Sequence, residues 1–117
     1  MKINSHQDLK VWQESMDLVE HIYRVTTTFP NGEQYGLTSQ MRRAAISIPS
    51  NISEGAGRKG GKEFQRFLHI AMGSLSELET QIEISNRLKY IEDITSLNNQ
   101  VIYIRRMLSK LIKSIVT

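Results

Sequence analysis

Basic side chains gather in two short segments of the sequence, and their types and spacing suit contact with phosphate groups. The two sets are Arg58, Lys59, Lys62 and Arg66, and Arg105, Arg106, Lys110 and Lys113. Residues 37–70 hold six basic residues against two acidic ones, and residues 94–117 hold four basic residues and no acidic one. Lys and Arg side chains neutralise backbone phosphates and release condensed counterions. The pattern therefore predicts binding to the RNA or DNA backbone without sequence specificity.

A second explanation of the same charges stays open. Residues 1–36 and 71–93 are acidic on balance, with five Asp or Glu residues each. The basic residues could therefore be ordinary solubilising charges that pair with these acids across the surface. The net charge of +3 does not separate the two explanations.

The sequence argues against catalysis, metals and cofactors. It contains no Cys, which removes thiol nucleophiles, disulfides and zinc–thiolate sites together. His6, His21 and His69 are scattered, and no Glu-x-x-His pair of the di-iron type occurs. The glycine-rich stretch 55–62 follows no strand and lacks P-loop spacing, although its backbone donors could contact a phosphate. We expect a protein that is not an enzyme and binds no metal or cofactor.

A polar face around Pro49 is unusual for a surface helix. Helical spacing brings together Arg43, Ser47, Ser50, Asn51 and Glu54. We favour a structural role, in which Asn51 and the serines satisfy backbone groups released by Pro49, and Glu54 pairs with an Arg. The alternative is that this face binds a ligand or a phosphate.

Apolar residues recur at intervals of three and four over most of the chain, which predicts four amphipathic helices. The clearest stripe forms an a/d seam over three heptads and comprises Ile94, Leu97, Val101, Ile104, Leu108, Leu111 and Ile115. The expected helices cover about 8–29, 38–56, 62–88 and 94–115. Thr38 and Asp93 are the expected N-caps of the second and fourth. We expect the second helix to be kinked at Pro49 but continuous.

Short connections between these helices favour antiparallel neighbours. The predicted fold class is all-α, an antiparallel up-down-up-down four-helix bundle formed by a single domain over residues 1–117. No signal-peptide core and no apolar run of membrane-spanning length is present, so we expect a cytoplasmic protein without membrane contact.

Self-association is expected as well. A second apolar strip (Trp12, Met16, Val19 and Tyr23) widens the first helix, and Ile102 and Ile112 flank the seam of the fourth. A lone bundle of this size covers only part of these side chains. A homo-oligomer would bury the rest and would suit either a nucleic-acid-binding protein or a protein–protein interaction scaffold.

Four stretches resemble one known family. They are Asp8 to Gln13, Arg43 to Gly55, Phe64 to Ala71 and Gly73 to Gln81, in order over nearly the whole chain. Together they are similar to the bacterial four helix bundle family, first noticed as reading frames inside intervening sequences of 23S ribosomal RNA genes. Gly60-Gly61 departs from the more polar linker that is usual there.

The resemblance implies a left-handed up-down bundle and no enzymatic activity. Relatives are similar to the accessory variability protein of diversity-generating retroelements. That protein assembles as a basic, barrel-like pentamer and associates with nucleic acid and a reverse transcriptase. A pentamer, RNA or DNA, and a protein partner are thus expectations that come from the resemblance. The family name itself records a genomic location.

Overall fold

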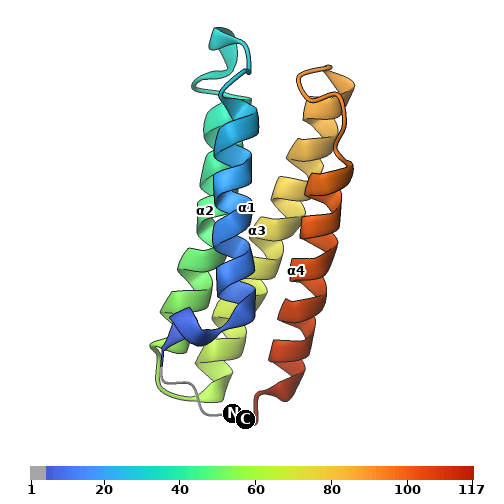
Figure 1. Ribbon diagram of the computed structural model, residues 1–117. Helices are drawn as coiled ribbons and strands as arrows, with labels where there is room; N and C mark the ends of the chain where they lie inside the picture. The colour runs from blue at the N-terminus through green and yellow to red at the C-terminus, as the bar shows by residue number, and fades with distance from the viewer. Residues whose placement is uncertain (1–4) are drawn as a thin grey trace.

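Four long helices make up the computed structural model, which describes residues 5–117. The elements are η1 (His6–Asp8), α1 (Lys10–Thr26), η2 (Asn31–Glu33), α2 (Leu37–Ala56), α3 (Gly61–Arg87) and α4 (Thr95–Ser114). Successive helices run in opposite directions, and the molecule is elongated, with extents of 45 × 24 × 19 Å (Figure 1). The predicted all-α four-helix bundle is confirmed.

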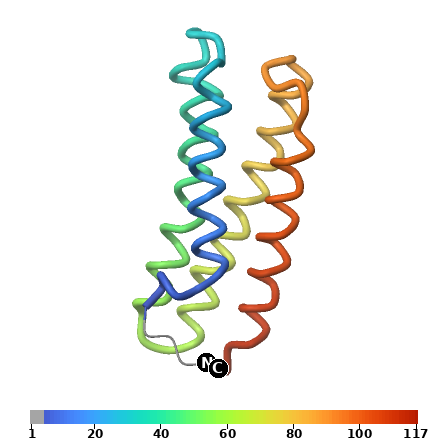
Figure 2. The backbone as a smooth tube through the Cα atoms, viewed as in Figure 1, coloured from blue at the N-terminus to red at the C-terminus, as the bar shows by residue number. Residues whose placement is uncertain are grey.

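The bundle has two distinct ends. Figure 2 shows the α2–α3 connection and the end of α4 at one of them, and the α1–α2 and α3–α4 connections at the other. Helix α1 packs on α2 and α4, and α3 also packs on α2 and α4. Residues far apart in the sequence therefore meet at each end.

The apolar stripes predicted from spacing form the core. Leu97, Val101, Ile104 and Leu108 of the α4 seam are at most 2% exposed. They face the buried stripes of the other three helices, and one continuous hydrophobic cluster results. Burial of these faces is what holds the helices side by side.

Helix α1 is shorter than the sequence predicts. It begins at Lys10, because Ser5 caps the separate turn η1 and Leu9 is extended. It ends at Thr26, where the hydroxyls of Thr26 and Thr27 donate to carbonyl oxygens one turn earlier, at 2.7 and 2.8 Å. A run of β-branched residues followed by Pro weakens a helix end in this way. Phe29 still packs into the core, from outside the helix.

The N-cap prediction for α2 is wrong. Thr38 is buried in the first turn, and the backbone N–H of Leu37 donates instead to Oε1 of Glu33 at 3.2 Å. The other carboxylate oxygen of Glu33 accepts from the Tyr90 hydroxyl at 2.9 Å, which ties together the two connections at this end. This hydrogen bond raises the pKa of Tyr90, since it stabilises the protonated phenol. Helix α2 then runs without interruption through Pro49.

Asp93 caps α4 from just outside the helix. Its Oδ1 accepts from the Thr95 N–H at 2.9 Å, and this bond lowers the pKa of Asp93. The N-cap position itself is Ile94, so Asp93 contacts the first turn from one residue before the position predicted for it, and the helix starts one residue later than expected.

Candidate nucleic-acid interface

Arg58 and Arg66 each form an ion pair with an acid that is nearby in the sequence. Arg58 lies 2.6 Å from a Glu54 oxygen, as expected for Glu54, and Arg66 lies 2.9 Å from Glu63. The Arg66 contact lowers the pKa of Glu63 and raises that of Arg66. Both guanidinium groups also lie over the ring of Phe67, at 5.1 and 4.6 Å from its centre. These two cations are thus already partly neutralised within the chain.

Lys59 and Lys62 are in a different situation. Both are exposed in the α2–α3 connection and the first turn of α3, and within residues 5–117 neither lies within 4.0 Å of an acid. Gly60 between them has a φ of +92°, a value that suits glycine and turns the chain sharply into α3. The turn therefore presents two unpaired ammonium groups to solvent.

Arg105 links α4 to α3. Its guanidinium donates to both carboxylate oxygens of Glu79, at 2.8 and 3.4 Å, and to the Ser76 hydroxyl at 3.4 Å. The side chain is one-third exposed. This geometry is that of a bidentate ion pair between neighbouring helices. Arg105 is accordingly less available to a phosphate than the sequence pattern suggests.

Arg106, Lys110 and Lys113 lie on the outer face of α4. All three are exposed, and their spacing of four and three residues puts them in one row opposite the buried seam. Over the described part of the chain, none of them forms an ion pair with an acid. The row therefore places three positive charges along the last two to three turns of α4.

The two basic segments meet at one end of the bundle. The side chain of Gln65 in α3 donates to the Ile112 carbonyl in α4 at 2.9 Å. Gly61 packs so closely on the chain after α4 that a Cβ there would lie 2.5 Å from the Val116 oxygen. We call this end of the bundle, together with the last three turns of α4, the basic end. It carries the exposed Lys59, Lys62, Arg106, Lys110 and Lys113, and Figure 1 shows that the α2–α3 connection and the end of α4 lie together there.

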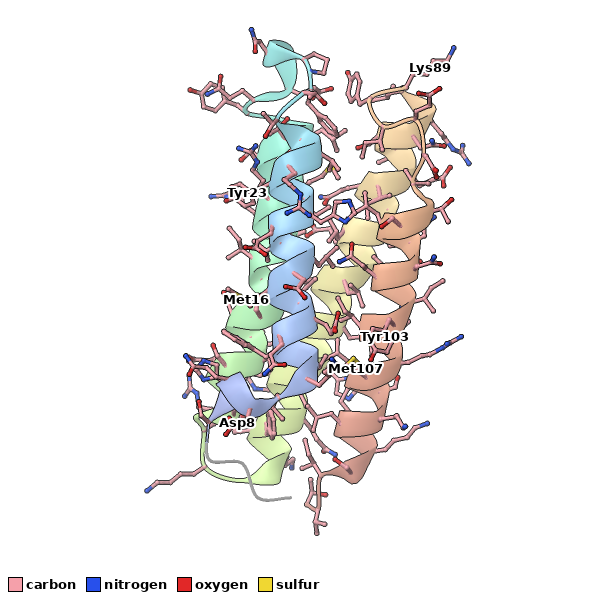
Figure 3. The ribbon with its side chains drawn as sticks, in the orientation of Figure 1. Asp8, Met16, Tyr23, Lys89, Tyr103 and Met107 are labelled. Carbon is pink, nitrogen blue, oxygen red and sulfur yellow. The ribbon has the colours of Figure 1, made fainter. Side chains whose placement is uncertain are left out.

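Acidic groups are distributed unevenly around this surface. Near the basic end, Asp8 is exposed in η1 (Figure 3), and Glu14 is held by Lys10 at 3.4 Å. Glu92 and Asp93 lie in the α3–α4 connection at the opposite end. The opposite end also carries the cations Arg87 and Lys89, and at the basic end Glu14, Glu54 and Glu63 are each already held by a cation of the chain.

The polar face of α2 serves mainly to join helices. Its Ser47 hydroxyl bonds to the Ser74 hydroxyl of α3 at 2.8 Å, and Asn51 donates to the Ser47 carbonyl and hydroxyl at 2.8 and 2.9 Å. We had expected these side chains to bond to the carbonyl one turn before Pro49. The bonds go to Ser47 instead. The three remaining members of the face, Arg43, Ser50 and Glu54, are exposed.

Tyr103 is an outer-face residue that the charge pattern does not reveal. It lies on α4 (Figure 3), three residues before Arg106 and seven before Lys110, and is 46% exposed. An aromatic residue at that spacing from two cations could have been found by extending the row of exposed positions toward the N-terminus of the helix.

Two further properties bear on the kind of site. Among residues 5–117, no three His, Cys, Asp or Glu side chains are placed to hold a metal ion. None of the helices in the described range is long and apolar enough to cross a bilayer.

The fold defines the class, which is an antiparallel four-helix bundle. Residues 7–110 match the family described as 23S rRNA-intervening sequence protein. This match covers most of the chain, and the protein belongs to that family. The resemblance found in the sequence is thereby confirmed.

A solved structure has the same fold. It is the crystal structure, at 1.70 Å resolution, of a protein with unknown function from the S23 ribosomal protein family of Bacteroides thetaiotaomicron. It is 26% identical to this chain, with a TM-score of 0.80, and the alignment covers 89% of this chain and 96% of that one. No protein with a curated description matches the chain.

Proposed function

We propose that this protein is not an enzyme and that it binds the phosphate backbone of RNA or DNA, without sequence specificity, through the basic end. The observation that carries the proposal is that Lys59 and Lys62 and the row formed by Arg106, Lys110 and Lys113 are exposed and belong to segments that meet at one end of the bundle. Unpaired cations on one surface attract a polyanion.

The strength of this binding depends on salt in a calculable way. If each of the five cations neutralises one phosphate, log K falls against log salt with a slope of about −3.5 for a single strand and about −4.5 for duplex DNA. Arg58, Arg66 and Arg105 add little to the slope, since their charges are already matched by carboxylates.

Assembly would strengthen the same interaction. Met16, Tyr23 and Ile46 are each about 40% exposed on the α1–α2 side of the bundle, where Figure 3 labels Met16 and Tyr23. Burying them between copies would repeat the basic end around a symmetry axis. A homo-oligomer is therefore part of the proposal, and the pentamer suggested by the resemblance is its most specific form.

The apolar α1–α2 side also supports a second candidate, an oligomeric interaction scaffold with no role in binding nucleic acid. A groove of about 330 Å³ lies there between the helices. Trp12, Met16, Val19, Ile46 and Pro49 line it. In this candidate function the groove and its surroundings contact proteins and the cations only keep the assembly in solution.

Titration with labelled RNA and DNA at several salt concentrations separates the two candidates. The variant Lys110→Gln should lower the magnitude of the salt slope by about 0.7 on a single strand, while Lys89→Gln should leave it unchanged. Lys89 is a matched control because it is exposed at the opposite end of the bundle (Figure 3). Absence of binding at low salt would refute the nucleic-acid proposal and favour the scaffold. Light scattering on a sizing column measures the assembly state, and a monomer at micromolar concentration would refute self-association.

A further inference from the structure

The outer face of α4 continues beyond the cations into a shallow hollow. The hollow has a volume of about 680 Å³ and lies beside the ring of Tyr103. It is lined by Asp93, Thr95, Ser96, Asn99, Gln100 and Tyr103. Aromatic, amide, hydroxyl and carboxylate groups thus surround a space at one end of the basic row.

We infer that this hollow accepts an unpaired base that stacks on Tyr103, while Arg106 and Lys110 hold the adjoining phosphates. The inference rests on the proposed function and refines it, since it names single-stranded nucleic acid as the preferred ligand. Tyr103 stands about one helical turn from Arg106 and two from Lys110 on the same face. An exposed ring beside a line of cations is the arrangement that binds single strands, because every base has a face that stacks.

The polar groups of the hollow determine which part of a nucleotide enters it. Asp93 repels a phosphate, but its carboxylate can accept hydrogen bonds from the amino group of a base. One of its oxygens already accepts from the Thr95 N–H, so the end of the helix is capped and is not an open anion site. The amide of Asn99 offers both a donor and an acceptor to a base edge. The base therefore belongs in the hollow and the phosphates belong toward the C-terminal half of α4.

The inner wall of the hollow is held in place from α1. The side-chain oxygen Oε1 of Gln100 accepts a hydrogen bond from the ring nitrogen Nδ1 of His21. This contact joins α1 to α4 and fixes one side of the space before any ligand arrives. A preformed wall lowers the entropy lost on binding.

A duplex cannot use this hollow in the same way, because its bases are paired and stacked within the helix. Duplex nucleic acid would reach only the cations of the basic end. The structure therefore separates two contributions to binding: a charge contribution shared by all nucleic acids, and a stacking contribution available only to unpaired bases.

The test compares the intact protein with Tyr103→Ala and Tyr103→Phe on three probes: a single strand of about twelve nucleotides, the same strand made abasic at every position, and the corresponding duplex. Tyr103→Ala should weaken binding to the single strand about five-fold or more, and Tyr103→Phe should stay within about two-fold of the intact protein. Neither change should alter binding to the abasic strand or to the duplex. Tyr35→Ala is the control, because that tyrosine is 90% exposed in the α1–α2 connection and does not line the hollow.

The outcomes separate the inference from the proposed function. Equal, salt-dependent binding of all three probes, unaffected by Tyr103→Ala, would overturn the stacking site and leave the phosphate-binding proposal intact. No binding of any probe would overturn both. Circular dichroism of each variant confirms that it is folded, so a loss confined to the base-containing single strand supports the inference.

Discussion

Gly55 lies where α2 and α3 come closest together, and a methyl group added there should destabilise the bundle. A Cβ on Gly55 would lie 2.7 Å from Cβ of Phe67 and 3.0 Å from Cδ1 of Phe64. The Phe67 atom is attached directly to the backbone, so it cannot move aside without shifting α3 itself. Overpacking of this kind costs about 1–3 kcal/mol.

Gly73 supplies the matched control in the neighbouring helix. It lies inside α3, and a Cβ there would meet nothing within 4 Å. Gly→Ala in an exposed helix interior stabilises by about 1 kcal/mol. The same gain in helix propensity applies to Gly55→Ala, so the difference between the two variants isolates the packing cost.

We therefore expect Gly73→Ala to raise the free energy of unfolding and Gly55→Ala to lower it, with the two separated by about 1–3 kcal/mol. Urea unfolding followed by far-ultraviolet circular dichroism measures both. In thermal unfolding, each kcal/mol corresponds to a shift of about 4 °C for a chain of this length. If Gly55→Ala proved as stable as Gly73→Ala, the close approach of α2 and α3 would be incorrect.

Three further predictions follow from individual contacts. Arg105→Gln should lower the free energy of unfolding by no more than about 1 kcal/mol, since its ion pair with Glu79 is partly exposed, and it should leave the salt dependence of nucleic-acid binding unchanged. The hydrogen bond from Tyr90 to Glu33 raises the folded-state pKa of Tyr90 above the unfolded value, so its stabilisation is present below pH ~10 and is lost as the pH rises further. Tyr90→Phe should remove that component, as unfolding curves at successive alkaline pH values would reveal. Asn51→Ala should cost about 1 kcal/mol in a urea titration through its lost hydrogen bonds, with no effect on oligonucleotide affinity.

Sequence spacing is sufficient to predict the helices, because the buried face of a helix appears as apolar residues at regular intervals within one short segment. The α4 seam, with intervals of three and four residues, identifies Leu97, Val101, Ile104 and Leu108 as core positions, and all four are buried. Helix ends are less predictable, because distant groups can cap them. Glu33 replaces Thr38 as the partner of the first α2 turn, because its side chain reaches over the three residues between Glu33 and Leu37.

The candidate site could be predicted only in part. Arg105 and Arg106 are adjacent and chemically identical, yet the first is held by Glu79 and the second is unpaired. Their difference arises from a rotation of 100° about the helix axis relative to α3, which neither residue reveals by itself. Tyr103 was not predicted as a site residue for a related reason, which is that its proposed role depends on the helix face it shares with the cations.

The sequence alone determined that four segments are helical, that their apolar stripes must pack together, and that two segments are rich in positive charge. These are properties of residue type and of spacing along one chain. Only the tertiary structure decided that the segments of Lys62 and Lys113 meet at one end of the bundle and that a hollow adjoins Tyr103. The reason is that charge and shape at a surface are set by which helix ends meet, and the meeting of α3 with α4 joins residues about fifty positions apart.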